Sequence, residues 1–375
     1  MEPKNAENGI ESQIVSPLLD WFAENARKLP WREDASPYNV WISEIMLQQT
    51  RVAAVKDYFA RFVRELPDIE ALAGVTEERL LKLWEGLGYY SRAKNLKRAA
   101  IVVMEEYGGR LPKKVEELLK LPGIGAYTAG AIASIAYDQV AAAVDGNVLR
   151  VMARIWGDRS EVNKESVRRD YEKRLVCVMP GDFPGAFNQA LMELGALVCL
   201  PKGRPHCADC PVAALCISHR ENSWGKIPVK MAKKPRRIEE RTVFLIEGEE
   251  GFFVRKRKES GLLSGLWEYP SVQGKKTEEE VRAMLCGDMV KEILPLGAAK
   301  HIFSHIEWRM LGYYVKLRQF SPQSEKICFQ KGEEHGIMNY TSDCFPVDFE
   351  KLRMDYSIPA AFSAYQRAVE KLRGQ

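Results

Sequence analysis

Apolar residues recur at three- and four-residue spacing along most of the first half of the chain, from about residue 12 to residue 198. That spacing is typical of one buried face of an α-helix. Short polar or Gly/Pro turns separate the periodic segments. We therefore predict an all-α region with helices over residues 78–84, 91–107, 115–119, 127–137, 147–156, 165–179 and 186–198.

One more helix is predicted to begin at Ser36-Pro37, where a serine N-cap precedes a proline at the first helical position. Apolar residues continue at helical spacing through residues 41–50 and as far as Phe62. The pattern therefore predicts helix along this whole segment.

The pattern changes after residue 241. Short β-type runs cover residues 242–246, 252–255, 301–310 and 311–317, and helical patterns cover residues 277–285 and 358–372. Lysines and arginines dominate residues 225–241 and indicate a solvated basic linker. We predict a helical domain (1–222), a linker (223–241) and an α+β domain (242–375).

Composition narrows the class of protein without identifying it. The 375 residues suffice for two cores, and a net charge of +4 is too small to identify a polyanionic partner. The chain has no apolar run of membrane-spanning length, and its first residues lack the pattern of an export signal. We expect a cytoplasmic protein that does not enter a membrane.

Four cysteines lie close together at Cys199, Cys207, Cys210 and Cys216, with the spacing C-x7-C-x2-C-x5-C. Four neighbouring thiols in a reducing compartment are typical of ligands to one inorganic centre. Prolines and glycines among them indicate a loop rather than a packed core. Either a structural zinc ion or an iron–sulfur cluster suits such ligands.

Residues 121–128, Leu-Pro-Gly-Ile-Gly-Ala-Tyr-Thr, form a turn between two predicted helices. Gly123 and Gly125 permit positive φ, and their lack of side chains lets backbone N–H groups face a phosphate at a helix N-terminus. The segment is typical of a helix-hairpin-helix that grips a nucleic-acid backbone. An ordinary helix–helix turn is the alternative.

Two carboxyl groups have contrasting surroundings. Glu44 lies among apolar residues of a predicted helix, where desolvation raises the pKa of a carboxyl group. Asp145 directly precedes a predicted helix, where the helix dipole favours a carboxylate. Such a pair suits glycosidic cleavage, although a solvent-facing glutamate and a simple N-cap are the plainer interpretations.

These stretches together resemble the helix-hairpin-helix DNA glycosylases, and among them the MutY-type adenine DNA glycosylases. The resemblance covers the helical region in order and is looser in the second domain, where residues 303–305 carry it. The matching segments are residues 29–32, 41–50, 84–91, 121–128, 144–148 and 185–188 and the cysteine loop.

The resemblance implies a helix-hairpin-helix domain with a [4Fe-4S] cluster loop, followed by a Nudix-like lesion-recognition domain. The implied substrate is duplex DNA with adenine opposite 8-oxoguanine or guanine, bound by a monomer. Glu44 would be the general acid, Asp145 would stabilise the oxocarbenium-like sugar, and Tyr127 and Asn147 would support it.

Further positions follow from the same resemblance. The adenine pocket would contain Arg27, Trp31, Arg32, Leu47 and Gln189. Contacts with DNA and with the lesion would come from Gln48, Gln49, Thr50, Tyr89, Gly123, Gly125, Phe303, Ser304 and His305.

Two departures and two alternatives remain. The first cysteine gap holds seven residues where the family usually has six, and the second domain lacks the R-E-x-x-E-E core of a Nudix box. One alternative is a pyrimidine-lesion glycosylase/lyase of the endonuclease III type, which needs a lysine nucleophile at the position of Tyr127. The other is a non-catalytic iron–sulfur DNA-binding protein.

The residue at position 127 predicts the outcome of a trapping experiment. A phenol cannot form a Schiff base, so borohydride should trap no covalent adduct between the protein and lesion-containing DNA. Gel electrophoresis of the protein–DNA mixture checks this. A trapped adduct would restore the lyase alternative.

Overall fold

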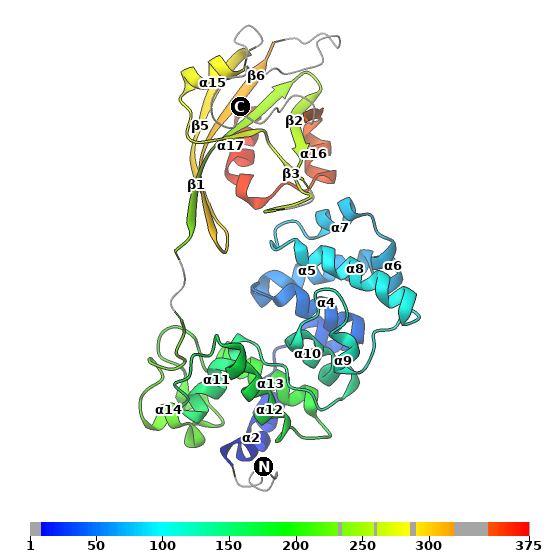
Figure 1. Cartoon of the computed structure of the whole chain (residues 1–375), viewed down its shortest axis with the longest axis vertical. Helices are drawn as coiled ribbons and strands as arrows, with labels where there is room; N and C mark the ends of the chain where they lie inside the picture. The colour runs from blue at the N-terminus through cyan, green and yellow to red at the C-terminus, as the bar shows by residue number, and fades with distance from the viewer. Residues whose placement is uncertain (1–8, 232–234, 259–260, 286–289, 319–343, 375) are drawn as a thin grey trace. The chain divides into compact units, whose positions relative to one another are not determined.

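The computed structural model describes residues 9–231, 235–258, 261–285, 290–318 and 344–374 (Figure 1). The chain forms two compact units. The first comprises Met1–Val75 and Ser91–Lys233, and the second comprises Thr76–Tyr90 and Lys234–Gln375. The helix within residues 76–90, α7 (Glu77–Leu83), therefore groups with the second unit.

The first unit is helical, as the periodicity predicts. Its α-helices are α1 (Ile10–Gln13), α2 (Val15–Asn25), α3 (Pro30–Glu33), α4 (Pro37–Leu47), α5 (Val52–Glu65), α6 (Ile69–Gly74), α8 (Ser91–Glu106), α9 (Val115–Leu118), α10 (Ala126–Tyr137), α11 (Gly146–Trp156), α12 (Glu165–Val176), α13 (Pro184–Leu197) and α14 (Ile217–Arg220). Two 3-10 helices, η1 (Cys207–Asp209) and η2 (Ala213–Leu215), lie in the cysteine loop. No described helix combines the length and apolar character needed to cross a membrane.

The prediction of helix through residue 62 was wrong at one point. Ser36 does cap α4, but α4 ends at Leu47 and α5 starts at Val52. Between them the Thr50 N–H donates to the Leu47 carbonyl at 3.2 Å, with Gln48 at φ −57°, ψ 109° and Gln49 at φ 61°. These values describe a type II turn, which the sequence conceals because no glycine occupies its third position.

Helix α10 lies at the centre of the unit and packs against α4, α9 and α13. Its small residues permit close approach: a Cβ added at Gly130 would lie 2.2 Å from the carbonyl oxygen of Ala142. A Cβ at Gly185 of α13 would similarly lie 2.6 Å from the carbonyl oxygen of Ser134. Helices α11 and α13 contribute Met152 and Phe187 to the apolar core of the unit, and both residues are fully buried.

The predicted hairpin joins α9 to α10. Gly123 has φ 79°, which confirms the expected left-handed position. The same expectation for Gly125 was wrong, because Gly125 has φ −96° and ψ 179° as the extended N-cap residue of α10. One glycine therefore turns the chain and the other starts the helix.

The second unit contains a mixed seven-stranded sheet with the main order β3-β2-β1-β6-β5, in which β4 pairs with β1 and β7 with β2. Among the described strand pairs, only β1–β6 is parallel. The strands are β1 (Arg237–Gly248), β2 (Gly251–Lys256), β3 (Trp267–Glu268), β4 (Ser271–Gln273), β5 (Val290–Ile302), β6 (Ile306–Leu317) and β7 (Cys344–Val347). The helices are α7, α15 (Glu278–Met284), α16 (Phe349–Asp355), η4 (Ala360–Phe362) and α17 (Ser363–Arg373).

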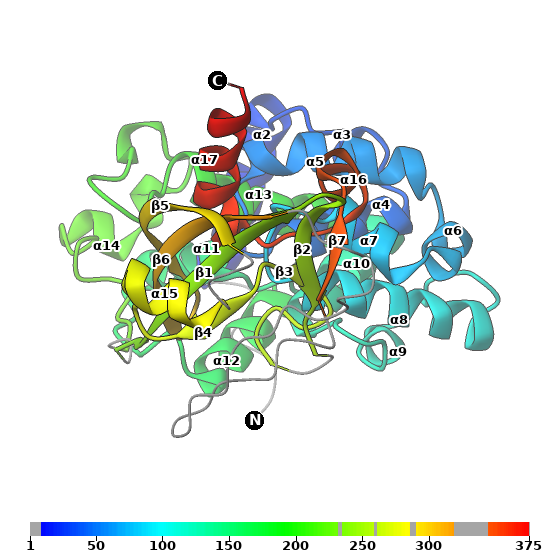
Figure 2. The same cartoon turned by 90° about the horizontal axis from the view of Figure 1, so that it is seen from above.

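Helix α15 lies on one side of β1 and helix α17 on the other (Figure 2). Alternate residues of β1 pack into these two layers. Val243 and Leu245 pack with residues of α16 and α17, whereas Phe244 and Ile246 pack with residues of α15. This alternation is that of a strand covered on both faces. The predicted helix near 277–285 is confirmed, with Thr277 and Glu280 forming a capping box.

The predicted strands 301–310 and 311–317 were wrong in their boundaries. Strand β5 ends at Ile302, residues 303–305 make a turn, and β6 continues without a break to Leu317. Alternation alone does not reveal a turn that contains no glycine or proline. The turn places residues 303–305, predicted to recognise the lesion, at one end of the β5–β6 hairpin.

The close contact at Gly130 predicts an unusual stability effect. Alanine in place of glycine inside a helix normally stabilises by up to about 1 kcal/mol. At Gly130 we expect a loss of about 1–3 kcal/mol from overpacking, seen as a lower melting temperature. Gly74→Ala in α6, where no atom lies within 4 Å of an added Cβ, is the matched control. Equal melting temperatures for both variants would contradict this packing.

Candidate active site

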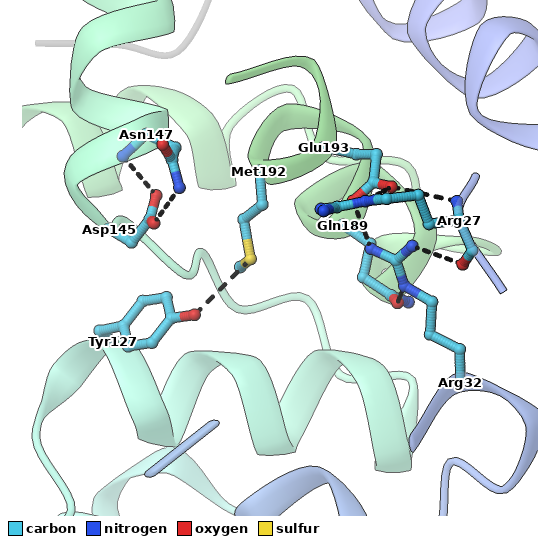
Figure 3. Close-up of polar contacts among 8 residues, drawn as sticks. All are labelled: Arg27, Arg32, Tyr127, Asp145, Asn147, Gln189, Met192 and Glu193. Atoms are coloured by element: carbon cyan, nitrogen blue, oxygen red, sulfur yellow. Dashed lines mark hydrogen bonds and ion pairs between the residues drawn. The ribbon is translucent and has the colours of Figure 1, made fainter. Parts of the chain in front are cut away.

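A cavity of about 740 Å³ opens within the first unit. Helices α3, α4, α10 and α13 and the N-terminus of α11 contribute to its walls (Figure 3). The structure therefore brings together all the residues predicted for chemistry and for adenine: Arg27, Trp31, Arg32, Glu44, Leu47, Tyr127, Asp145, Asn147 and Gln189. Four residues predicted to contact DNA or the lesion also line the cavity: Gln48, Gln49, Thr50 and Gly125.

Glu44 is buried in the wall of this cavity, with 6% of its surface exposed. Desolvation raises the pKa of its carboxyl group from 4.5 to about 7. The hydrogen bond from the Tyr127 hydroxyl and the charge of Arg32 oppose this rise, while the charge of Asp145 adds to it. The raised pKa predicted from the sequence is confirmed, so Glu44 can hold a proton near neutral pH.

Tyr127 projects from the first turn of α10, and its hydroxyl group donates a hydrogen bond to Oε2 of Glu44. Its oxygen also lies 3.6 Å from Sδ of Met192 (Figure 3). Burial and the neighbouring carboxyl groups raise the pKa of Tyr127 well above its usual value. The phenol therefore stays protonated and acts as a donor in the site.

Asp145 is the N-cap of α11, which confirms the plainer interpretation, and it also faces the cavity. Oδ1 accepts from the backbone N–H groups of Asn147 and Val148, each at 2.8 Å, and Oδ2 accepts from Nδ2 of Asn147 at 2.8 Å (Figure 3). Burial raises the pKa of Asp145, and these three donors and Arg150 act against that rise. The sequence suggested that the helix dipole keeps Asp145 ionised. In the fold, burial outweighs the stabilising contacts and the pKa of Asp145 is raised.

Asn147 connects this carboxyl group to the cysteine loop through Arg150, a residue that sequence reasoning missed. Nη2 of Arg150 donates to Oδ1 of Asn147 at 2.9 Å and to the Gly195 carbonyl at 2.7 Å. Its Nε donates to the Cys199 carbonyl at 2.8 Å. A continuous set of hydrogen bonds therefore fixes the orientation of Asn147 from behind the site.

Glu193 is a second residue that the sequence did not single out. Its carboxylate, 1% exposed, accepts Nε of Arg27 at 2.7 Å and Nη2 of Arg32 at 2.9 Å. Although burial acts in the opposite direction, these donors lower its pKa to about 2. Nε of Arg32 also donates to Oε1 of Gln189 at 3.0 Å (Figure 3). The sequence signal that could have identified Glu193 is its position four residues after Gln189 in an otherwise apolar helix.

Two apolar side chains, Trp31 and Leu47, also line the cavity. Trp31 is 5% exposed and packs edge-on against Phe59, with ring centroids 5.3 Å apart. Leu47 lies at the end of α4, just before the turn that carries Gln48, Gln49 and Thr50.

The four cysteines of the loop line one small cavity beside α11. Nη1 of Arg154 donates to Sγ of Cys199 at 3.3 Å. Over the described ranges, no group of three or more His, Cys, Asp or Glu residues is arranged to hold a single metal ion. The four thiols line one shared space, which is compatible with an iron–sulfur cluster.

The predicted lesion readers belong to the second unit. Phe303 stacks edge-on between His301 and Trp308, with centroid distances of 4.6 and 4.9 Å. Ser304 and His305 are exposed at the tip of the turn. Tyr89, at φ 47°, lies with its hydroxyl oxygen 3.0 Å from Oγ of Ser304.

Comparison with known proteins places this arrangement in a class. Residues 42–176 match the HhH-GPD superfamily of base excision DNA repair proteins, and residues 242–365 match the NUDIX domain. A helical repair domain with buried carboxyl groups in its cavity, followed by a Nudix-like domain, defines a base excision DNA glycosylase.

The relatives are more specific. The adenine DNA glycosylase of Mus musculus is 36% identical over 364 residues, covering 81% of this chain and 70% of the mouse protein. That of Buchnera aphidicola subsp. Schizaphis graminum is 34% identical, covering 88% of this chain and 92% of its own length. The chain belongs to the adenine DNA glycosylase family.

A solved structure supports the fold of the helical region. The thermostable thymine-DNA glycosylase superposes with a TM-score of 0.52 at 31% identity, covering 58% of this chain and all of that structure. The resemblance and the fold class predicted from the sequence are therefore confirmed.

The raised pKa of Glu44 predicts a pH-dependent gain in stability on its removal. In the unfolded chain Glu44 ionises near pH 4.5, but in the fold it ionises only near pH 7. Above pH 7 the folded state therefore carries a penalty on the order of 3 kcal/mol, which fades below pH 5. Glu44→Gln should raise the melting temperature at pH 8 and change it little at pH 5.

The same substitution at the exposed Glu24 is the control and should have little effect at either pH. Thermal denaturation of the three proteins at both pH values measures the difference. A Glu44→Gln variant that is less stable than wild type at pH 8 would contradict the desolvation of Glu44.

Proposed function

We propose that this protein removes adenine from duplex DNA in which adenine lies opposite 8-oxoguanine or guanine, by hydrolysis without strand scission. The observation that carries the proposal is the buried Glu44 beneath the Tyr127 hydroxyl, in the same cavity as Asp145. Membership of the adenine DNA glycosylase family supports the choice of base.

Glu44 acts as the general acid in this proposal. A carboxyl group with a pKa of about 7 is protonated in about half of the molecules at pH 7 and can transfer that proton to N7 of adenine. The base then leaves as a neutral molecule. The Tyr127 hydroxyl orients the Glu44 side chain by binding one of its oxygens.

Asp145 stabilises the positive charge that develops on the sugar as the glycosidic bond breaks. Its three hydrogen bonds fix the carboxylate in position before the reaction. Asn147 supports it directly, and Tyr127 stands where a lyase would carry its lysine. The reaction is therefore proposed to stop at base removal.

Adenine must leave the base stack to reach this cavity, at a cost of a few kcal/mol. We propose that Trp31 and Leu47 contact the faces of the extruded base. Arg27, Arg32 and Gln189 supply the polar edge of the pocket, and Glu193 holds the two guanidinium groups in place.

Contacts with the rest of the DNA are proposed for three sets of residues. The hairpin with Gly123 and Gly125 presents backbone N–H groups at the start of α10 to a phosphate. Gln48, Gln49, Thr50 and Tyr89 fill the vacated stack and hold the opposite base. Phe303, Ser304 and His305 read the altered edge of 8-oxoguanine.

We further propose that Cys199, Cys207, Cys210 and Cys216 hold one [4Fe-4S] cluster. Their shared cavity and the donor from Arg154 to Cys199 fit sulfur ligands of a buried group. The cluster would hold the loop closed, and Arg150 would transmit that order to Asn147. The protein would act on the chromosome as a cytoplasmic monomer.

A duplex assay tests the function. Incubation with an adenine:8-oxoguanine duplex should leave an alkali-labile site at the adenine, with slower reaction at adenine:guanine and none at adenine:thymine. Cleavage is measured on denaturing gels after treatment with alkali. A duplex that stays intact after alkali would refute adenine removal.

The acid assignment has its own variant. Glu44→Gln should lower the single-turnover rate by at least about 10²-fold, the usual contribution of a general acid, while duplex affinity changes little. Glu24→Gln should match wild type. An active Glu44→Gln variant would remove Glu44 from the proposed mechanism.

A further inference from the structure

The end of the catalytic helix α4 is held by one buried guanidinium group. Arg92, in the first turn of α8, is only 8% exposed. Its Nη1 donates to the carbonyl oxygens of Ile45 at 2.6 Å, Met46 at 3.1 Å and Gln48 at 2.7 Å. The final carbonyls of a helix lack partners within the helix, and a cation there also complements the helix dipole.

The bond to Gln48 differs from the other two, because it acts on the turn. The peptide between Gln48 and Gln49 is the central peptide of the type II turn over residues 47–50. Its carbonyl orientation distinguishes a type II turn from a type I turn. Arg92 therefore holds this peptide in the orientation that gives Gln49 its positive φ of 61°.

Gln49 has no glycine-like freedom, so its backbone conformation needs such support. A non-glycine residue at the third position of a type II turn is uncommon and strained. Strain of this kind persists where surrounding contacts impose it, and it is concentrated at functional sites. In this chain the contact that imposes it comes from Arg92, outside the turn.

Helix α8 also reaches the other DNA-binding turn. A Cβ added at Gly123 would lie 2.6 Å from Cβ of Asn95, so the hairpin packs directly against α8 one turn after Arg92. Arg92 and Asn95 thus hold the turn at residues 47–50 and the hairpin against one rigid element. The separation between the two turns is set by α8.

We propose that Arg92 is a positioning residue for base extrusion, which holds Gln49 in the backbone conformation that fills the space vacated by adenine. The proposal rests on the function proposed above. It assigns Arg92 no contact with adenine, so the chemistry at Glu44 and Asp145 is affected only through the extruded state.

A fluorescence experiment measures extrusion without chemistry. In the Glu44→Gln background, the full-length protein is saturated with a duplex that carries 2-aminopurine, an adenine analogue that brightens when unstacked, opposite 8-oxoguanine. Adding Arg92→Met should reduce the fluorescence rise by at least about threefold, because the extruded state is less populated. Arg98→Met removes the same charge from an exposed position of α8 and should leave the rise unchanged.

Kinetics separate positioning from general damage. With Glu44 intact, Arg92→Met should slow single-turnover adenine release about 10–100-fold on the paired substrate, and far less on a duplex whose adenine is an unpaired bulge. Arg92→Lys keeps the charge but not the planar fork, so it should fall between Arg92→Met and wild type and serves if Arg92→Met does not fold.

Equal losses on paired and bulged adenine, or an unchanged fluorescence rise, would overturn the role of Arg92. Absence of adenine release by the wild-type protein would instead refute the proposed function. The two failures are therefore distinguishable.

Discussion

The desolvation of Glu44 is the constraint on which the rest of the site depends. Helix α4 is buried along most of its length, so its one carboxyl group, Glu44, is desolvated. Within the described part of the chain, the Tyr127 hydroxyl is its one hydrogen-bond donor. One neutral donor does not offset the loss of water, and the pKa rises to about 7. The small residues of α10 let this part of the cavity wall approach the segment that carries Asp145.

Glu44, Asp145 and Glu193 are three of the four carboxyl groups that line this cavity, and their partners give them different properties. Glu193 receives two guanidinium groups, and its pKa falls to about 2 in spite of burial. Asp145 receives two backbone N–H groups and an amide, and burial still raises its pKa. Among the described residues, Glu44 accepts a hydrogen bond only from the phenol of Tyr127. The charge and number of donors, rather than depth alone, decide which group can carry a proton at neutral pH.

Local signals in the sequence were enough for the helical region, the caps at Ser36 and Asp145 and the positive φ of Gly123. They were not enough for Glu193 and Arg92, whose partners lie far away along the chain. The break after Leu47 was also hidden, because a distant arginine rather than a glycine stabilises the turn. Gly125 illustrates the opposite error: a glycine was expected to be left-handed, but it adopts an extended conformation.

The most direct test of a protonated Glu44 is the pH dependence of single-turnover adenine release by the wild-type protein. With enzyme in excess over an adenine:8-oxoguanine duplex, the rate should be level below about pH 7 and fall about tenfold per pH unit above it, as Glu44 loses its proton. A rate that stays level or rises from about pH 7 to pH 9 would contradict a proton held by Glu44.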